Sequence, residues 1–431
     1  MTMALIGFAV LVAISLTGIP LAFAALLVGF AGFSIVRGVD PAIAMSGQQI
    51  AEMIVNANLV VVPLFILMGE LIRRAGIADE LYEFGNALVG RFRGGLAMST
   101  VIACGAFAAV CGSSVATAAT MTKVALPPMR RFGYHDSLSA GTVAAGGTLG
   151  ILIPPSIPMV IYCIFAREDI GRMFMAGVVP GLLMMTIFIG TIAVWAYLRP
   201  GIAPAGAVMP WPDRLRALRR TWAFIALFAV VLGGIYLGVF TPTEAASVGA
   251  LGAYFFALGR GKMRKLTDYL DVLGSAAGIS ATIFAIASCS MVFAQFINIT
   301  GLPYALEELV RTWGVSGMSL VLAICFLCVL LGMVFDALGI LVLIVPIFLP
   351  SLQAQGVDLI WFGVLVIILI ELGLITPPVG VNVFTVKAAR PDLQLTDIFV
   401  GIAPFVVAMV LTAGLILVLP GIATGLPNLM R

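Results

Sequence analysis

Two short polar stretches interrupt long apolar segments of this 431-residue sequence, and both carry side chains that can bind an ion or a polar molecule. The first contains Gly112, Ser113, Ser114 and Thr117; the second contains Asp336. Hydroxyl and carbonyl oxygens are hard ligands that suit Na⁺, and serine hydroxyls also hold carboxylates. A carboxyl group in an apolar segment is costly, so we interpret Asp336 as a group that ligates a cation, takes a proton or binds substrate. Close packing of small residues is the alternative for the first stretch, and a structural cap or a buried pair is the alternative for Asp336.

Each polar stretch is followed along the chain by a proline pair inside another apolar segment. TLGILIPPSIP (148–158) carries the first pair and ELGLITPPVGVN (371–382) carries the second. Proline in a helix interior costs roughly 3 kcal/mol, so we expect both helices to break at mid-membrane and leave backbone groups for a ligand. A kink without a site is the alternative, against which the two matching copies argue. The candidate site residues at the breaks are Gly150, Ser156, Gly373, Thr376 and Asn382, and Glu371, which matches Thr148, is a weaker candidate.

The composition indicates a helical membrane protein that crosses the bilayer several times. Hydrophobic residues make up 62% of the chain and charged residues 10%, with a formal net charge of +3. Apolar runs of about 18 or more residues recur, as in transmembrane helices, whereas the short alternating segments of a transmembrane β-barrel are missing. The apolar N-terminus shows no basic leader and no clear cleavage site, so we expect it to be a retained span.

The sequence lacks the motifs of common nucleotide-dependent and hydrolytic enzymes. It has no Walker A sequence, dinucleotide-binding fingerprint, G-x-S-x-G or H-E-x-x-H. The single histidine, His135, cannot build a zinc site or a histidine-based triad. The six cysteines lie scattered in apolar segments, as small buried hydrophobes do. We therefore expect no enzyme, no cofactor and no nucleic-acid partner, and transport driven by an ion gradient.

The segments around the polar stretches are too long for single crossings. A helix over 96–129 would be about 51 Å long, against a hydrocarbon core of about 30 Å. Two legs that meet near Gly112 fit a re-entrant hairpin instead, and 316–350 has the same form around Asp336. The other expected elements are spans at about 4–34, 54–72, 172–198, 221–240, 243–259, 275–297 and 396–420, amphipathic arm helices at 77–92 and 302–313, and broken helices at 136–165 and 358–388.

The order of these elements repeats, which predicts a duplicated half. Landmarks recur at offsets of 223 to 225 residues, among them Gly76 with Gly301 and Gly150 with Gly373. Repeats of opposite orientation with broken helices near the midplane are typical of transporters. We expect a first inverted repeat over 1–198, a cytoplasmic linker and inserted span over 199–242, and a second inverted repeat over 243–431.

The positions of the basic residues support this topology. With the N-terminus in the cytoplasm, re-entrant hairpins at 96–129 and 316–350 and single crossings elsewhere, 18 Lys and Arg residues fall inside and 5 outside, as the positive-inside rule requires. Making 96–129 a crossing and 136–165 the hairpin gives 15 against 8, so that alternative is disfavoured but stays open. The C-terminus is expected on the periplasmic side.

The motifs together resemble the large membrane subunit of tripartite ATP-independent periplasmic (TRAP) transporters, the DctM-like permeases. The resemblance covers essentially the whole chain and rests on CGSSVATAATMTKVALPPM, GGTLGILIPPSIPMVIY, AGVVPG and ELGLITPPVGVNVF. It implies an elevator-type inverted-repeat fold. It also implies Na⁺-coupled uptake of an organic acid, such as a C4-dicarboxylate, a 2-oxo acid or sialic acid, across the bacterial inner membrane.

The resemblance also implies partners and residue roles. The partners would be a small four-span membrane subunit and a periplasmic substrate-binding protein, with membrane lipid around the chain. By resemblance, Ser113, Ser114, Ser156 and Asp336 belong to the substrate site. We expect Na⁺ between each hairpin tip and the facing break, and no other metal. The expected Na⁺-binding residues are Gly112, Ser113, Ser114, Thr117, Gly150, Asp336, Gly373, Thr376 and Asn382.

Three other functions remain open from the sequence. A stand-alone ion-coupled carboxylate transporter would share these motifs without the two partners. An intramembrane enzyme would need a nucleophile or an acid–base cluster near an interface, whereas the polar candidates gather at mid-membrane. A channel would need a continuous series of pore-lining groups.

Overall fold

The computed structural model describes residues 2–206, 209–312, 314 and 316–430, and the regular elements of this part of the chain are all helical. The first half holds α1 (Thr2–Leu16), α2 (Leu21–Arg37), α3 (Val39–Val55), η1 (Ala57–Val60), α4 (Val61–Ala75), α5 (Ile77–Val89), α6 (Gly95–Cys111), α7 (Ser114–Arg131), α8 (Asp136–Leu152), α9 (Ile157–Ala166) and α10 (Ile170–Leu198). The second half holds α11 (Trp211–Tyr236), α12 (Pro242–Gly259), α13 (Leu266–Ile299), α14 (Leu302–Thr312), α15 (Gly317–Gly332), α16 (Ala337–Ala354), α17 (Leu359–Ile375), α18 (Val381–Ala389), α19 (Leu395–Val418), α20 (Gly421–Thr424) and η2 (Pro427–Leu429).

Several of these helices suit a membrane. Five are long and apolar enough to cross one, or up to seven if each of two bent pairs counts as one span. The bent pairs are α3 with η1 and α4, and α8 with α9. The prediction of an all-helical chain with several apolar helices is confirmed.

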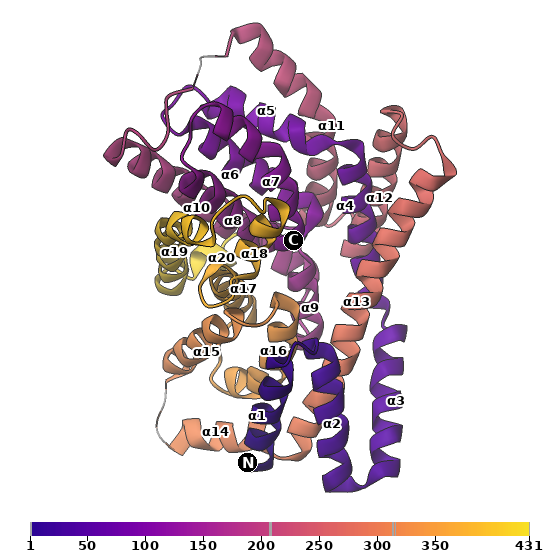
Figure 1. The fold of residues 1–431 in the computed structure, drawn as a ribbon. Helices are drawn as coiled ribbons and strands as arrows, with labels where there is room; N and C mark the ends of the chain where they lie inside the picture. Colours follow the sequence, from indigo (N-terminus) through magenta and orange to yellow (C-terminus); the bar gives the residue numbers. More distant parts are fainter. Residues whose placement is uncertain (1, 207–208, 313, 315, 431) are drawn as a thin grey trace.

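Both long polar-tipped segments form pairs of packed helices that turn at the residues predicted from the sequence (Figure 1). α6 ends where Gly112 adopts a left-handed φ of 59°, which glycine takes without strain. Ser113 then caps α7 by accepting a hydrogen bond from the Ala116 N–H at 3.4 Å. In the second pair, Asp336 caps α16 by accepting from the Gly339 N–H at 3.2 Å. Each turn therefore ends one helix and starts the next within a few residues.

The predicted span over 4–34 is wrong, because the chain folds back on itself within it. α1 ends at Leu16, Gly18 has a left-handed φ of 94°, and Pro20 precedes α2. α1 and α2 pack side by side, and the N-terminus lies at the same end of the molecule as the α2–α3 connection (Figure 1). One crossing is thereby lost, so a cytoplasmic N-terminus no longer follows. The charge count missed this, because residues 1–20 contain no Lys or Arg.

The structure differs from the sequence prediction at three other places. α3 was not predicted because Asp40, Gln48, Gln49 and Glu52 make it too polar for a span. The linker 199–220 is partly helical, since α11 already begins at Trp211. The span expected over 275–297 is part of the longer helix α13.

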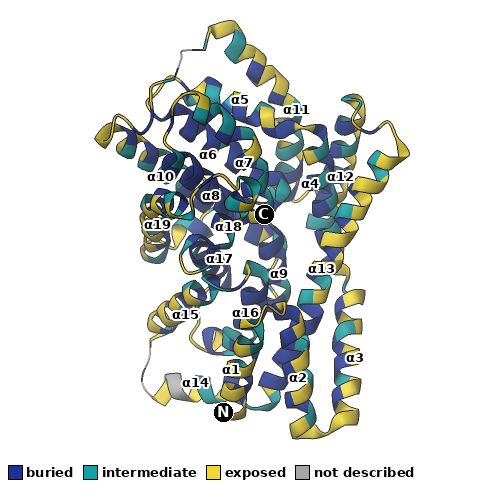
Figure 2. Cartoon of the chain, viewed as in Figure 1, coloured by how far each residue is buried: buried dark blue, intermediate teal, exposed yellow. Residues whose placement is uncertain are grey.

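The helices form two packed groups (Figure 1). In one group α2 packs along α13 and α12 packs along α4, with α3 beside α13. In the other, α8 is surrounded by α6, α7 and α19, and α17 packs on α15 and α19. α8 and α17 are buried along almost their whole length and form the centre of this second group (Figure 2). The two groups touch mainly where α13 meets α16, where α11 meets α5 and where α4 meets α6.

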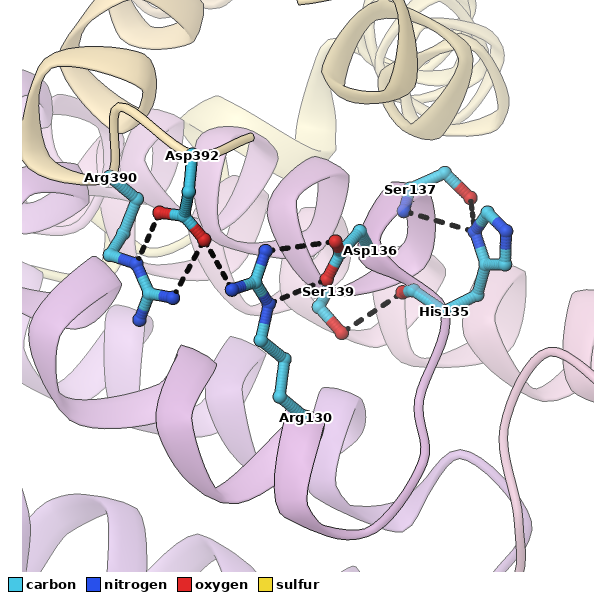
Figure 3. A network of polar contacts seen from close by, with 7 residues as sticks. All are labelled: Arg130, His135, Asp136, Ser137, Ser139, Arg390 and Asp392. Atoms are coloured by element: carbon cyan, nitrogen blue, oxygen red, sulfur yellow. Dashed lines mark hydrogen bonds and ion pairs between the residues drawn. The ribbon is translucent and has the colours of Figure 1, made fainter. Parts of the chain in front are cut away.

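An ion-pair network joins the two halves of the sequence at the base of the first hairpin (Figure 3). Arg130 of α7 donates to both carboxylate oxygens of Asp136 at 2.7 and 2.8 Å, and it also pairs with Asp392. Arg390 donates to Asp392 at 2.8 and 2.9 Å. His135, which caps α8, stands beside this network and bonds Ser137. The loop after α18 is thereby fixed to the ends of α7 and α8.

Asp392→Asn is expected to lower the stability of the fold. The size of this effect should depend on pH only below about pH 4. Arg390 and Arg130 hold the pKa of Asp392 below its usual range. Because the folded pKa is depressed, the stabilisation is present above the ordinary carboxyl pKa of about 3.9 and is lost as the pH falls below it. Thermal melts of parent and variant should show a constant difference in Tm from about pH 8 to 5 and a shrinking one below about pH 4. A difference that changes between pH 8 and 5 would contradict this assignment.

Candidate functional site

One cavity of about 280 Å³ brings together both hairpin tips and both helix breaks. α13 closes its remaining side. The first half of the chain contributes Gly112, Ser113, Ser114, Val115, Ile151, Ile157 and Pro158, and the second half contributes Asp336, Ala337, Leu338, Leu374, Val381 and four residues of α13, namely Ile279, Thr282, Ile283 and Ile286. Four segments that are far apart in sequence therefore meet at one place.

Four helices begin at the wall of this cavity. Ser114, Ile157, Ala337 and Val381 are the first residues of α7, α9, α16 and α18, and all four line it. The first turn of a helix has unpaired N–H groups and carries the positive end of the helix dipole. This arrangement suits a bound anion.

The first tip lies directly on the broken helix α8. A Cβ atom on Gly150 would lie 2.7 Å from the Ser113 carbonyl oxygen, so only glycine allows this approach. A Cβ atom on Gly112 would lie 3.2 Å from the Pro155 carbonyl oxygen. The tip and the break are therefore held against each other by backbone contact.

The second tip meets its break in the same way. A Cβ atom on Gly373 would lie 2.5 Å from the Cα of Gly332, the last residue of α15. A Cβ atom on Gly332 would lie 2.9 Å from the Ile370 carbonyl oxygen. Gly373 therefore has the same packing role as its counterpart Gly150 in the first half.

Three predicted hydroxyl residues bond backbone carbonyls next to the tips and breaks. Ser156 donates to the Ile151 carbonyl at 2.6 Å and is almost fully buried. Thr117 donates to the Ser113 carbonyl at 2.8 Å, and Thr376 donates to the Leu372 carbonyl at 2.5 Å. The bonds from Ser156 and Thr376 satisfy carbonyl groups that the ends of α8 and α17 leave open, whereas the Ser113 carbonyl also accepts the Thr117 N–H at 3.1 Å.

The predicted residues thus divide into two sets. Gly112, Ser113, Ser114 and Asp336 line the cavity. The others stand behind it as packing or hydrogen-bonding groups, namely Thr117, Gly150, Ser156, Gly373, Thr376 and Asn382.

Two buried polar side chains behind the second break have no hydrogen-bond partner. Glu371 and Asn382 are both fully buried, and no polar atom of either side chain is bonded. Buried polar groups are normally paired, so these two side chains, which bond no other group among the described residues, are candidates for contact with a ligand.

Asp336 lies between two cavities. It also lines a second one, of about 440 Å³, together with the α1–α2 turn at 20–23 and the middle of α13. Asp336 is the single ionisable side chain among the described residues that line either cavity. The described residues contain no group of three or more His, Cys, Asp or Glu side chains that could hold a metal ion. The site therefore offers polar binding groups but no acid–base pair or activated nucleophile.

The sequence reasoning missed the wall that α13 provides. The residues of this wall are Ile279, Thr282, Ile283 and Ile286. They lie in a part of α13, after Asp271, that has no charged residue and no proline, and nothing distinguishes them from residues that face lipid. It also placed Glu371 among the weaker candidates, because a single carboxyl beside a break does not reveal that its surroundings lack a partner.

The family described as "Tripartite ATP-independent periplasmic transporter, DctM component" matches residues 5–422. This chain belongs to that family. The TRAP large permease resemblance seen in the sequence is therefore confirmed, and so is the expectation of a transmembrane transporter subunit rather than an enzyme. As its name states, the family supplies one component of a three-part transporter.

TRAP large permeases with different substrates in their names are similar to this chain. The C4-dicarboxylate permease DctM of Pseudomonas aeruginosa is 35% identical over 86% of both chains. The ectoine permease TeaC of Halomonas elongata is 31% identical over 99% of both chains. The sialic acid permease SiaM of Vibrio cholerae is 30% identical over 96% of this chain and 95% of that one.

Among solved structures, the YdaH transporter of Alcanivorax borkumensis has a similar fold. It superposes with a TM-score of 0.66 over 90% of both chains at 14% sequence identity. At that identity the likeness concerns the fold alone.

Proposed function

We propose that this TRAP large permease is a Na⁺-coupled carrier that takes up a small organic acid across the bacterial inner membrane. The proposal rests on one observation: both tips and both breaks meet in a single cavity. The starts of α7 and α9 there suit a carboxylate, and the oxygen groups around the cavity suit Na⁺. The relatives named for dicarboxylate and sialic acid transport support an acid as the substrate.

The packing of the helices supports an inverted repeat. α2 packs along α13 in the same way that α12 packs along α4, and the amphipathic helices α5 and α14 lie at opposite ends of the molecule (Figure 1). On this pattern α11 and α12 are the counterparts of α1 and α2. We therefore propose that the second repeat begins at α11 and that the inserted span expected over 221–240 belongs to it.

From this repeat we propose that the N-terminus lies on the periplasmic side, together with the C-terminus. Because α1 and α2 fold back, the chain first crosses with α3 and α4 and brings Arg73 and Arg74 to the cytoplasm. A protease added to intact spheroplasts should remove an epitope tag from the N-terminus and leave one inserted at 205–206 intact. A protected N-terminal tag would contradict this topology.

We further propose an elevator motion in which the hairpin-containing group slides along α4 and α13. Both surfaces carry small residues where the groups meet. A Cβ atom on Gly69 of α4 would lie 2.8 Å from the Val110 carbonyl oxygen near the first tip. The small four-span subunit and the periplasmic binding protein are proposed as the other two components, with lipid around the static group.

Na⁺ binding is the experiment that tests the proposal. The purified chain, with its small subunit, should show a saturable rise in Tm with NaCl that KCl at equal ionic strength does not give, since a ligand that binds only the folded state stabilises it. The partnerless Asn382 amide and the oxygens of the tips are the groups that would gain the ion. Equal responses to the two salts would contradict sodium coupling.

A further inference from the structure

We infer that the substrate is a small monocarboxylate with an apolar body, such as a branched-chain 2-oxo acid, rather than a dicarboxylate, a sugar acid or a zwitterion. This inference rests on the proposed function, which it narrows. It follows from the unequal chemistry of the two ends of the cavity and from the nature of its walls.

The end formed by the first half can hold one carboxylate. Ser113 and Ser114 line it, and α7 and α9 begin there. Hydroxyl donors and the N-terminal N–H groups of two helices are suitable partners for a carboxylate. Every charged substrate in the classes considered has at least one such group.

The end formed by the second half disfavours a second carboxylate. Asp336 lines the cavity there and already accepts the Gly339 N–H at the start of α16. Val381, at the start of α18, brings no hydroxyl. No Lys, Arg or His is among the described residues of the cavity wall. A dicarboxylate would therefore place its second negative charge beside another carboxyl group without a cationic side chain to pair with it.

The walls between the two ends are apolar. They consist of Val115, Ile151, Ile157, Leu338, Leu374 and three isoleucines of α13. Thr282 also lines these walls, but its hydroxyl group already donates to the Gly278 carbonyl at 2.9 Å. A sugar acid would bury several hydroxyl groups without partners here, which is unfavourable. An aliphatic body would instead bury apolar surface.

The size of the cavity agrees with a small ligand. Its volume of about 280 Å³ lies just below the range of about 300–1,000 Å³ found for small-molecule sites. The proposed Na⁺ and Asp336 would together form a pair without net charge. This end of the cavity would then offer no net positive charge to a second carboxylate and no net negative charge to the cationic group of a zwitterion.

Ligand-induced stabilisation of the purified chain with its small subunit, in NaCl, tests the inference. The four probes are 4-methyl-2-oxopentanoate, succinate, N-acetylneuraminate and ectoine. We expect 4-methyl-2-oxopentanoate to raise the Tm at concentrations at least about tenfold lower than the other three, since small differences in an apolar pocket change binding by about this factor.

A pair of variants tests whether the cavity wall causes the preference for a substrate with an apolar body. Ile283→Thr puts a hydroxyl into the apolar wall and should weaken 4-methyl-2-oxopentanoate binding about tenfold while leaving the response to NaCl unchanged. Val292→Thr is the matched control, because Val292 is buried in the same helix but does not line the cavity. Equal effects of the two substitutions would overturn the inference.

The outcomes separate this inference from the proposed function. Succinate, N-acetylneuraminate or ectoine binding as tightly as 4-methyl-2-oxopentanoate would overturn the inference and leave an organic-solute transporter. If none of the four probes raises the Tm in NaCl, the proposed function fails, and the inference fails with it.

Discussion

Asp336→Asn is expected to abolish Na⁺-driven uptake while leaving the fold intact. Asparagine caps a helix about as well as aspartate, so the start of α16 should be kept and only the charge lost. Hydrogen bonds to charged groups contribute up to about 3 kcal/mol, and the loss of about 3 kcal/mol corresponds to an uptake rate roughly 100-fold lower. The measurement is uptake into proteoliposomes together with the Tm of the variant in the absence of Na⁺.

Asp358→Asn is the matched control for this variant. Asp358 also caps a helix, α17, by accepting from the Trp361 N–H at 2.9 Å, and it lies outside the cavity. Its substitution should leave uptake unchanged within about twofold, as expected for replacing one good N-cap residue by another. Normal uptake by Asp336→Asn would remove Asp336 from the proposed site, and a large fall in its Tm would show that the carboxylate is needed for the fold instead.

Gly150→Ala is expected to lower both stability and uptake. The new methyl group would lie 2.7 Å from the Ser113 carbonyl oxygen, and neither backbone can move without separating the tip from the break. Overpacking of this kind costs about 1–3 kcal/mol, so the Tm should fall and the tip should lose its position over the cavity. Melting curves and uptake assays on the same preparation measure both effects.

Gly190→Ala provides the comparison for Gly150→Ala. Gly190 lies within α10, and a Cβ atom there would meet nothing within 4 Å. Alanine is favoured over glycine by up to about 1 kcal/mol in a helix interior, so this variant should be as stable as the parent or more so. A Gly150→Ala protein with parental Tm and uptake would show that the tip and the break are not held by this contact.

The sequence predicted the parts of the site that depend on local rules. Glycine at a positive φ, serine or aspartate as an N-cap and proline after a helix end are local signals, and they placed both tips and both breaks correctly. The direction of each side chain is not local. Ser156 turned to the Ile151 carbonyl and away from the cavity, because its own helix break left that carbonyl unpaired.

The α1–α2 turn and the α13 wall could not be predicted for related reasons. Positive-inside counting needs basic residues, and residues 1–20 offer none, so a folded-back hairpin and a crossing look alike there. In α13 the residues that face the cavity and those that face lipid are equally apolar, so only tertiary packing distinguishes them.

α13 is longer than the hydrocarbon core of a membrane is thick. Its 34 residues extend over about 51 Å, and the part after Asp271 alone measures about 42 Å, against a hydrocarbon core of about 30 Å. Such a helix must lean steeply, protrude, or draw thicker lipid around itself. The second tip packs against α13. In the elevator motion that we propose, a change in the tilt of α13 would therefore alter the path of the hairpin-containing group. Acyl-chain length thereby becomes a physical variable of transport, independent of substrate and ion concentration.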